Sequence, residues 1–409
     1  MNRRLRALVQ RVWGPNGGSS PVAVTTGPPP DGYVAVETYA VVPDLAHARY
    51  LVPLDSRRAG VATLWTYHTM RAPTRRAAEA VVSTLFRAHC GDSLFRRRLV
   101  VSIDSRVPNA RHADWLLLAH LARELDRPRL FAGLAVRRVQ PSSKPMLELF
   151  DRAGEPLGFA KLGWSPATNN LVRAEIDTLE ALKGRLRRVV APRPLSHGYF
   201  NGHAYSVVSP LARGLRRCES DPVVACDAPL KVATSAAVSH GPVDGSAYAT
   251  RLRQALGSTA TAAPSEFHVL DGWLARLERD PTPLRYGRWH GDWVPHNLAR
   301  TGETVAAWDW EHSSADTPIG FDALHWHFQR ALPLGGLAAG VYAVDRASAR
   351  LGGYGASPAT GRLLASLYLL EMFVRGCVLA VGGGGWNLRV HPGMLEVAAW
   401  RDRDARESA

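Results

Sequence analysis

The segment that most restricts the fold of this chain is WHGDWVPHNLARTGETVAAWDWE, residues 289–311. Its polar residues recur at intervals that do not fit one face of an amphipathic helix, and Pro295 would interrupt a helix here. Asp292 and Asn297 are therefore expected on a loop. The sequence RTGE that follows is a turn between two short apolar runs, so the chain is predicted to form a hairpin that returns from Asn297 to Asp309.

Such a hairpin would point the side chains of Asn297 and Asp309 into the same space. One amide oxygen and one carboxylate are hard oxygen ligands, and they suit Mg²⁺ bound together with phosphate and water. Asp292, at the mouth of the loop, is free to accept a proton from a substrate hydroxyl. The alternative interpretation of all three residues is a capped surface turn between helices.

The motif HGDWVPHN followed by WDWE resembles the catalytic loop and metal-binding segment of the aminoglycoside phosphotransferase and choline kinase group. Members of that group share the two-lobed protein-kinase fold. The resemblance implies that Asp292 is the catalytic base and that Asn297 and Asp309 hold Mg²⁺ beside ATP. It covers about residues 134–400 and does not extend to the first third of the chain.

Three neighbouring residues have supporting roles by the same resemblance. His290 would orient the catalytic loop, and Glu311 would lie near the metal or the substrate. Asp322, in the sequence PIGFD, matches a structural aspartate that is expected to cap a helix.

The resemblance also implies a lysine on the third strand of the small lobe, paired with a glutamate on the next helix. This lysine would hold the α and β phosphates of ATP. Lys161 lies in the apolar strand GFAKLGW, and Glu175 follows 14 residues later. A lysine in an apolar strand is costly unless it is paired, and only four of the 50 basic residues are lysines. Two alternatives remain: Lys161 could face solvent from an edge strand, and Asp177 or Glu180 could replace Glu175 as the partner.

No G-x-G-x-x-G motif precedes Lys161, where the predicted hairpin tip is QPSSKP. Ser142, Ser143 and Lys144 could supply hydroxyl, backbone and ammonium donors to the phosphates, although an ordinary polar turn is the alternative. The segment YSVVSPL would connect the two lobes, and backbone groups there, around Val208, would take the adenine edge.

The fold class predicted from these observations is α+β, a two-lobed protein-kinase-like fold with an extra N-terminal α/β region. The strands LAVRRVQ, MLELFD and LGFAKLGW, separated by turn sequences, indicate an antiparallel meander, and Asn169 or Asn170 is expected to cap the helix that follows. The predicted division is an N-terminal extension of unknown role over 1–130 with a flexible segment at 14–32, a small lobe over 131–211, a helical lobe over 212–400 and a tail over 401–409.

The net charge of +14 does not point clearly to nucleic acid, because the arginines are scattered without a block of six or more. The four cysteines form no C-x-x-C pair, and the N-terminus has no apolar core of the kind found in secretory signals. The longest apolar stretch, 363–381, contains Glu371 and Arg375 and is better explained as a buried helix than as a membrane span. A cytoplasmic protein without a membrane partner is expected, and its oligomeric state is left open.

Several other activities are disfavoured. The chain has no G-x-S-x-G elbow, and no Ala-Pro-Glu follows Asp309 as it would in a protein kinase. His325 and His327 would face different directions on a helix, so packing and core hydrogen bonds are expected for them instead of one metal. The prediction is an ATP- and Mg²⁺-dependent phosphotransferase acting on a hydroxyl of a small molecule. The alternative is a catalytically silent kinase-like binding module, and a nucleic-acid binder is a distant third.

Overall fold

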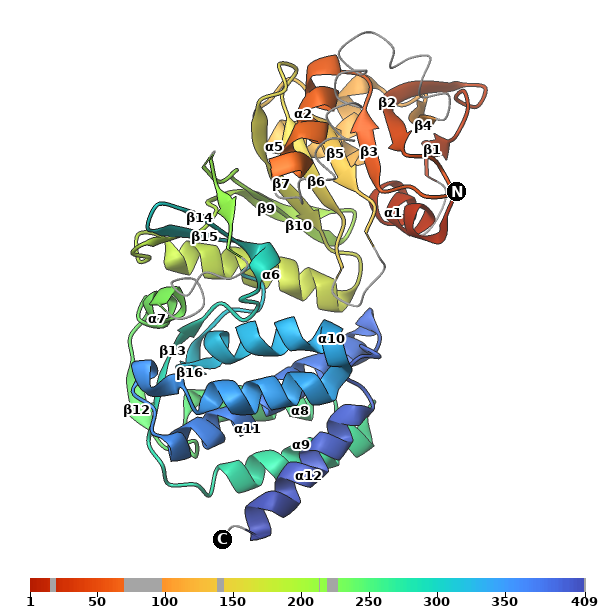
Figure 1. Cartoon of the computed structure of the whole chain (residues 1–409). Coiled ribbons are helices and arrows are strands. Elements are labelled where there is room, and N and C mark those ends of the chain that lie inside the picture. The colour runs from red at the N-terminus through yellow and green to blue at the C-terminus, as the bar shows by residue number, and fades with distance from the viewer. Residues whose placement is uncertain (15–19, 70–97, 138–142, 213, 219–226, 408–409) are drawn as a thin grey trace.

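The structure is a computed structural model of the chain, and it describes residues 1–14, 20–69, 98–137, 143–212, 214–218 and 227–407. An antiparallel sheet with flanking helices occupies the N-terminal half, and a mainly helical lobe occupies the C-terminal half (Figure 1). This arrangement confirms the predicted α+β class and its two lobes.

The largest sheet among the described residues contains nine strands, and every neighbouring pair in it is antiparallel. β5 pairs with β3 on one side and with β6 on the other, so the sheet passes from the N-terminal region into the small lobe without a break. The strands, in spatial order, are β1 (Val22–Thr25), β4 (Arg98–Asp104), β2 (Tyr33–Val42), β3 (Tyr50–Pro53), β5 (Phe131–Ala135), β6 (Met146–Phe150), β7 (Pro156–Leu162), β10 (His203–Val208) and β9 (Pro194–Phe200).

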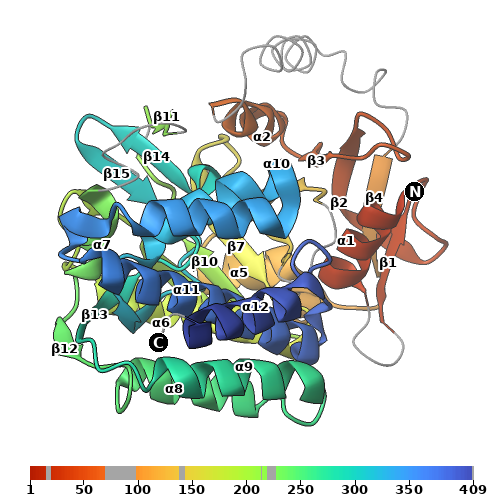
Figure 2. The same cartoon turned by 60° about the horizontal axis from the view of Figure 1, so that its bottom comes forward.

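One hydrophobic core joins the two parts of this sheet. It combines Leu5 and Leu51 from the N-terminal region with Leu147 and Leu162 from the small lobe, all of them buried. The helices on this half of the molecule are α1 (Arg3–Trp13), α2 (Arg57–Thr69), the short η1 (Asn109–Asp114) and α5 (Leu117–Glu124). Figure 2 shows α1 beside β1, β2 and β4. β1 lies within the segment that was predicted to be flexible.

The helix α6 (Pro166–Leu182) lies between the sheet and the helical lobe (Figure 1). Its N-cap is Ser165, whose hydroxyl accepts from the backbone N–H of Thr168 in a capping box. The predicted caps, Asn169 and Asn170, are wrong, because both lie inside the helix. The capping box and the proline at the first helical position fix the start of α6 earlier.

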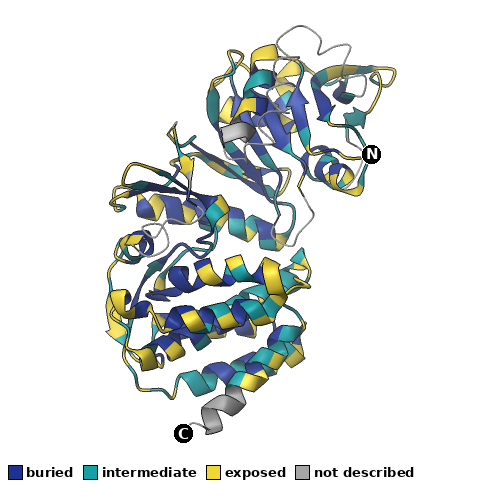
Figure 3. Ribbon diagram, in the orientation of Figure 1, coloured by how far each residue is buried: buried dark blue, intermediate teal, exposed yellow. Residues whose placement is uncertain are grey.

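The long helices of the helical lobe pack against one another through their buried faces, which Figure 3 shows in dark blue. α10 is interrupted at Gly335 and Gly336, whose backbone angles are not helical. The helices are α7 (Ala228–Ala233), α8 (Ala247–Gly257), α9 (Pro264–Leu277), α10 (Phe321–Ser348), α11 (Pro358–Leu379) and α12 (Gly393–Glu407), with the short turns η3 (Pro295–Asn297), η4 (Leu351–Tyr354) and η5 (Ala380–Gly384).

Two small sheets complete the lobe. In one of them β8, which follows α6, runs parallel to β15. The strands are β11 (Arg216–Arg217), β14 (Leu298–Thr301), β15 (Thr304–Ala307) and β8 (Val189–Val190) in the first sheet, and β12 (Ser239–Gly241), β13 (Leu284–Trp289) and β16 (Ser314–Pro318) in the second.

The segment Pro358–Gly384, which includes α11, is the stretch of the described chain long and apolar enough to cross a membrane. Over half of its apolar window (56%) is buried against the rest of the lobe. Its Glu371 is buried and accepts from Arg251 of α8 at 3.0 Å. α11 is therefore a core helix of this lobe, as predicted.

Candidate active site

The hairpin predicted between Asn297 and Asp309 is formed by β14 and β15. Leu298 pairs with Ala307, and the turn beyond them contains Gly302 with a φ of +56°. The N–H of Trp308 donates to the carbonyl of Asn297 at 3.1 Å, which extends the pairing by one more residue. The hairpin therefore begins just after Asn297 and returns the chain to Asp309.

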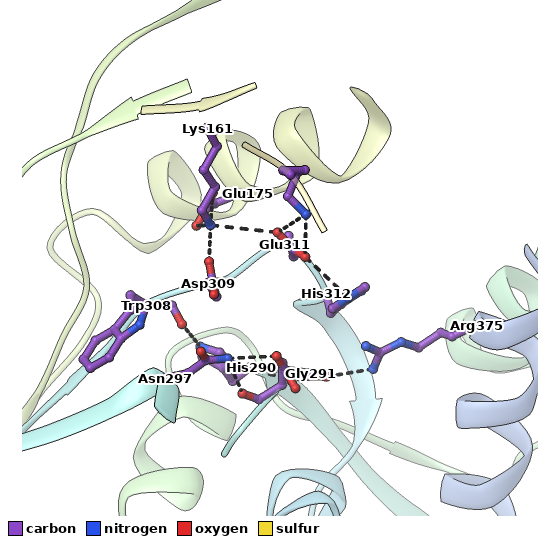
Figure 4. Close-up of polar contacts among 12 residues, drawn as sticks. Lys161, Glu175, His290, Gly291, Asn297, Trp308, Asp309, Glu311, His312 and Arg375 are labelled. Atoms are coloured by element: carbon purple, nitrogen blue, oxygen red, sulfur yellow. Dashed lines mark hydrogen bonds and ion pairs between the residues drawn. The ribbon is translucent and has the colours of Figure 1, made fainter. Parts of the chain in front are cut away.

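A buried ammonium group joins three separate parts of the chain above this hairpin (Figure 4). Nζ of Lys161, on β7, lies 2.7 and 2.8 Å from the two carboxylate oxygens of Glu175 on α6, and it also contacts Asp309. The Lys161 side chain is 9% exposed, and Glu311 lies 3.8 Å away. Lys161 is therefore paired within the site and does not face solvent from an edge strand.

The charges of this cluster depend on one another. Burial lowers the pKa of Lys161, but the carboxylates of Asp309, Glu175 and Glu311 raise it by more, so the net shift is upward. Burial raises the pKa of Asp309, and the ammonium of Lys161 outweighs it and brings this pKa down to about 2. Lys161 and Asp309 thus form a charged pair near neutral pH.

Of the three acidic residues considered on α6, the structure selects Glu175. Its side chain is buried against Lys161, whereas Asp177 and Glu180 are exposed. The reason is the helical period, because Glu175 adjoins the buried residues Val172 and Ile176.

Lys144, which lies just before β6, contacts the cluster. Its Nζ donates to Oε1 of Glu311 at 2.8 Å, and both side chains are almost fully buried. The carbonyl of Ser143 accepts from the indole of Trp164 at 2.8 Å and from Arg11 of α1 at 3.3 Å. Ser142 lies outside the described residues.

Val208 ends β10, at the start of the segment that leads into the helical lobe. It is buried in a core with Ile176 of α6 and Trp293 of the loop after β13. Lys161 pairs with Ser206, two residues earlier on β10, so Val208 shares the face of the sheet that bears the ammonium. Among the described residues, Val208 and Lys161 are not joined by a hydrogen bond or an ion pair.

Both carboxylate oxygens of Asp292, on the loop after β13, are hydrogen-bonded. Oδ1 accepts from Nε2 of His325 at 3.1 Å, and Oδ2 accepts from Nδ2 of Asn297 at 2.8 Å. Burial raises the pKa of Asp292, but the hydrogen bond from His325 contributes to a larger opposite effect, and the net pKa is below the usual range. The side chain is 30% exposed, so part of the ionised carboxylate is open to solvent.

His290 connects the catalytic loop to the segment before Asp309. Its Nδ1 accepts from the N–H of Asp292 at 3.2 Å, and its Nε2 donates to the carbonyl of Trp308 at 3.1 Å. Burial lowers the pKa of His290 to about 4, so the ring is neutral at pH 7. Through these two contacts, His290 links the backbone of Asp292 to that of Trp308.

Asp322 supports the same loop from the first turn of α10. Its carboxylate accepts from the backbone N–H of His290 at 2.7 Å and from that of Gly291 at 3.0 Å. The predicted helix cap is wrong, because the N-cap of α10 is Gly320 and Asp322 lies inside the helix. The carbonyl of Gly291 accepts from Arg375 of α11 at 2.7 Å, so the loop is held from two helices.

The residues predicted to hold Mg²⁺ fit such an ion in their chemistry. Among the described residues, the side chain of Asn297 donates twice from Nδ2, both times to Asp292, so Oδ1 would be the ligand atom. Asp309 supplies an ionised carboxylate. Within the described residues, no group of three or more His, Cys, Asp or Glu side chains could hold a metal by itself. An ion at this position would therefore need water or phosphate oxygens as further ligands.

Sequence reasoning did not place two residues of this site. His325 was expected to pack and to form core hydrogen bonds, but not to contact Asp292, and Tyr368 was not singled out. Tyr368 lies on α11, and its hydroxyl is 3.0 Å from Nδ1 of His325. Both residues are fully buried, although each carries a polar ring. Polar rings at core positions of apolar helices are the sequence signal that could have identified them.

Solved structures that are similar to this chain include kinases of sugars and sugar derivatives. A protein from Haemophilus somnus 129PT described as a fructosamine-3-kinase is 10% identical, and the match covers 63% of this chain and 96% of that one with a TM-score of 0.35. A glucosamine kinase is 17% identical over 74% of this chain and 86% of its own length, with a TM-score of 0.31.

A third structure is a glucosamine kinase in complex with glucosamine, ADP and inorganic phosphate. It is 18% identical over 74% of this chain and 84% of its own, with a TM-score of 0.28. No protein-family model and no curated protein matches the chain. TM-scores this low add no support to a function, which has to rest on the residues of the site.

Proposed function

We propose that this chain is an ATP-dependent kinase that transfers the γ-phosphoryl group to a hydroxyl of a small molecule. The observation that carries the proposal is the meeting of Lys161, Glu175 and Asp309 around one buried ammonium. These residues come from a strand, a helix and the end of a hairpin far along the chain. Asp292 and Asn297, the proposed base and metal ligand, lie on the loop just before the same hairpin.

In this proposal Lys161 holds the α and β phosphates of ATP. Glu175 keeps the ammonium in place from behind, which leaves its remaining donor directed at Asp309 and the space beside it. Lys144 adds a second cation at the edge of the same space, where it now pairs with Glu311. Two ammonium groups suit a triphosphate, because they neutralise charge that develops on the phosphate oxygens during transfer.

Asp292 would act as the base. Its carboxylate accepts the proton of the acceptor hydroxyl while the hydroxyl oxygen forms a bond to the γ phosphorus. The bond between that phosphorus and the bridging oxygen of ADP breaks, and ADP leaves with the bond electrons. Asn297 and Asp309 would hold Mg²⁺, which when bound neutralises negative charge on the phosphates.

Thermal-shift titration tests nucleotide binding without knowledge of the acceptor. ATP with Mg²⁺ is expected to raise the melting temperature of the wild-type chain, and Lys161→Met is expected to lose this stabilisation. Lys183→Met is the matched control, because Lys183 is an exposed lysine at the end of α6. An identical stabilisation of all three proteins would contradict the proposed phosphate site. No stabilisation of the wild-type chain by ATP with Mg²⁺ would favour a binding module without catalysis.

Turnover is then measured as ATP consumption across amino sugars, amino alcohols, nucleosides and sugars. Asp292→Asn is expected to reduce turnover by roughly 10²-fold to 10⁴-fold, the usual contribution of a general base, while ATP binding survives. Asp316→Asn, which removes an exposed carboxylate on β16, is expected to have no effect. Retained consumption by Asp292→Asn would show that Asp292 is not the base.

A further inference from the structure

His325 occupies a position where an apolar residue would be expected. It lies on α10, is 0% exposed, and packs edge-on against the rings of Trp289 and Tyr368. An imidazole in such a place loses its hydration, and burial lowers the pKa of His325 accordingly. The cost is offset only if both ring nitrogens are hydrogen-bonded, and both of them are.

The two partners of His325 fix which nitrogen bears the proton. Nε2 faces Oδ1 of Asp292 at 3.1 Å, and an ionised carboxylate can only accept a hydrogen bond. Nδ1 lies 3.0 Å from the hydroxyl of Tyr368, which can donate to it. The arrangement in which both bonds form is therefore the neutral Nε2–H tautomer, with the Tyr368 hydroxyl donating to Nδ1.

This chain of hydrogen bonds joins three elements that are distant in sequence. Asp292 is on the loop after β13, His325 is 33 residues later on α10, and Tyr368 is a further 43 residues along, on α11. Asn297 fixes the other oxygen of Asp292 from the opposite side. The plane of the carboxylate is therefore held at both ends by donors from well-packed elements.

From this geometry we propose that His325, with its tautomer set by Tyr368, is a positioning residue that aims the carboxylate of Asp292 at the acceptor hydroxyl. The proposal rests on the proposed function, in which Asp292 is the base. His325 does not take the proton of the acceptor, because its Nε2 already bears one. Its effect is geometric: with one donor lost, the Asp292 carboxylate can rotate about its bond and lose alignment.

Steady-state kinetics distinguish positioning from packing. His325→Leu places an apolar side chain in the buried position and removes the hydrogen-bond donor to Asp292. The kcat is expected to fall by about 10-fold to 100-fold, which is the cost of a small misplacement of a reacting group. The KM for ATP is expected to stay unchanged, because the nucleotide is held by other residues. His325→Gln offers an amide nitrogen near the place of Nε2 and is expected to recover most of kcat.

His327→Leu is the matched control, since this histidine lies on the same helix and is exposed. Tyr368→Phe keeps the ring and removes the hydroxyl, so it is expected to lower kcat less than His325→Leu does. If His325→Leu fails to fold, Tyr368→Phe still tests the positioning role. Wild-type kcat in both His325→Leu and Tyr368→Phe would overturn the positioning role while leaving the proposed function intact.

A spectroscopic measurement on the wild-type chain is independent of activity. The ¹⁵N signals of the histidine rings report which nitrogen is protonated, and the signals of His325 are those that disappear in His325→Gln. The expected result is a neutral ring protonated at Nε2. A ring protonated at Nδ1 would overturn the proposal, whereas a wild-type chain that consumes no ATP with any acceptor would overturn the proposed function itself.

Discussion

Nζ of Lys161 lies 2.7 Å from Oε1 of Glu175, so an ion pair that is shielded from solvent ties β7 to α6. Removal of one partner of such a pair leaves the other charge desolvated, which makes the pair sensitive to substitution even where its net contribution to folding is small. Asp309 also contacts the ammonium, so Lys161 would keep one carboxylate if Glu175 were lost.

Glu175→Gln is expected to weaken ATP binding and to destabilise the fold. The ammonium would move toward Asp309, away from the place proposed for the phosphates, so the KM for ATP should rise by roughly 10-fold while folding stability falls by a few kcal/mol, up to about 3–5 kcal/mol. Steady-state kinetics and urea unfolding measure the two effects. Glu180→Gln, at an exposed position of the same helix, should change neither, and an equal change in both variants would contradict a specific role for Glu175.

Asp322→Ala is expected to impair turnover indirectly, because Asp322 supports the loop that carries Asp292. Burial raises the pKa of Asp322 to about 7, yet its two oxygens accept the N–H groups of His290 and Gly291. Loss of both acceptors should cost roughly 1–3 kcal/mol for each orphaned N–H. Asp322→Asn keeps one acceptor oxygen and should be intermediate in urea unfolding and in kcat. A variant with Ala that is as stable as the one with Asn would contradict this reasoning.

Gly291→Ala tests the close approach of the catalytic loop to the segment after Asp309. The φ of Gly291 is +83°, and a Cβ atom here would lie 2.2 Å from the carbonyl oxygen of His312. The substitution should therefore both strain the backbone and displace the loop. Gly302→Ala is the control, because its φ is +56° but, among the described residues, the added carbon would meet no atom within 4 Å beyond Gly302 and its two chain neighbours. The backbone strain should lower its free energy of unfolding by about 1–2 kcal/mol, measured by urea unfolding, and turnover should be unchanged.

Glu37→Gln is expected to change how the stability of the fold depends on pH. Burial raises the pKa of Glu37 from 4.5 to about 7, against opposing hydrogen bonds from Tyr39 and Trp13. Between these values the folded chain binds more protons than the unfolded chain, so the free energy of unfolding falls as the pH rises. The largest effect is on the order of 3 kcal/mol.

Urea unfolding at pH 5 and pH 8 measures this effect. The Gln side chain can still accept from the hydroxyl of Tyr39, which now donates to Glu37 at 2.7 Å, but it does not titrate. The variant should therefore gain stability over the wild type at pH 8 more than at pH 5. Glu124→Gln, an exposed glutamate on α5, should show no such difference between the two pH values.

Local signals predicted most of the candidate site. The turn RTGE and its apolar flanks were enough to predict the hairpin that links Asn297 to Asp309. The choice of Glu175 needed the phase of α6, which the sequence left open between three acidic residues. The capping box at Ser165 was a local signal too, but the asparagines inside the helix competed with it.

The parts that sequence reasoning missed depend on contacts between distant elements. His325 contacts Asp292 because α10 packs against the loop after β13. A pattern of neighbouring residues does not predict such a contact. The pairing of β5 with β3 is of the same kind, since β3 precedes it by some 80 residues. Register between distant strands follows from the whole core and not from the residues of either strand.

The unbroken sheet has a mechanical consequence for the N-terminal region. Because β3 and β6 flank β5 and share one core, a chain shortened to begin at residue 131 would expose a full strand edge and the apolar face of Leu134 and Leu147. For the same reason, a hinge movement of the small lobe over a nucleotide would carry β1, β2, β3 and β4 of the same sheet with it.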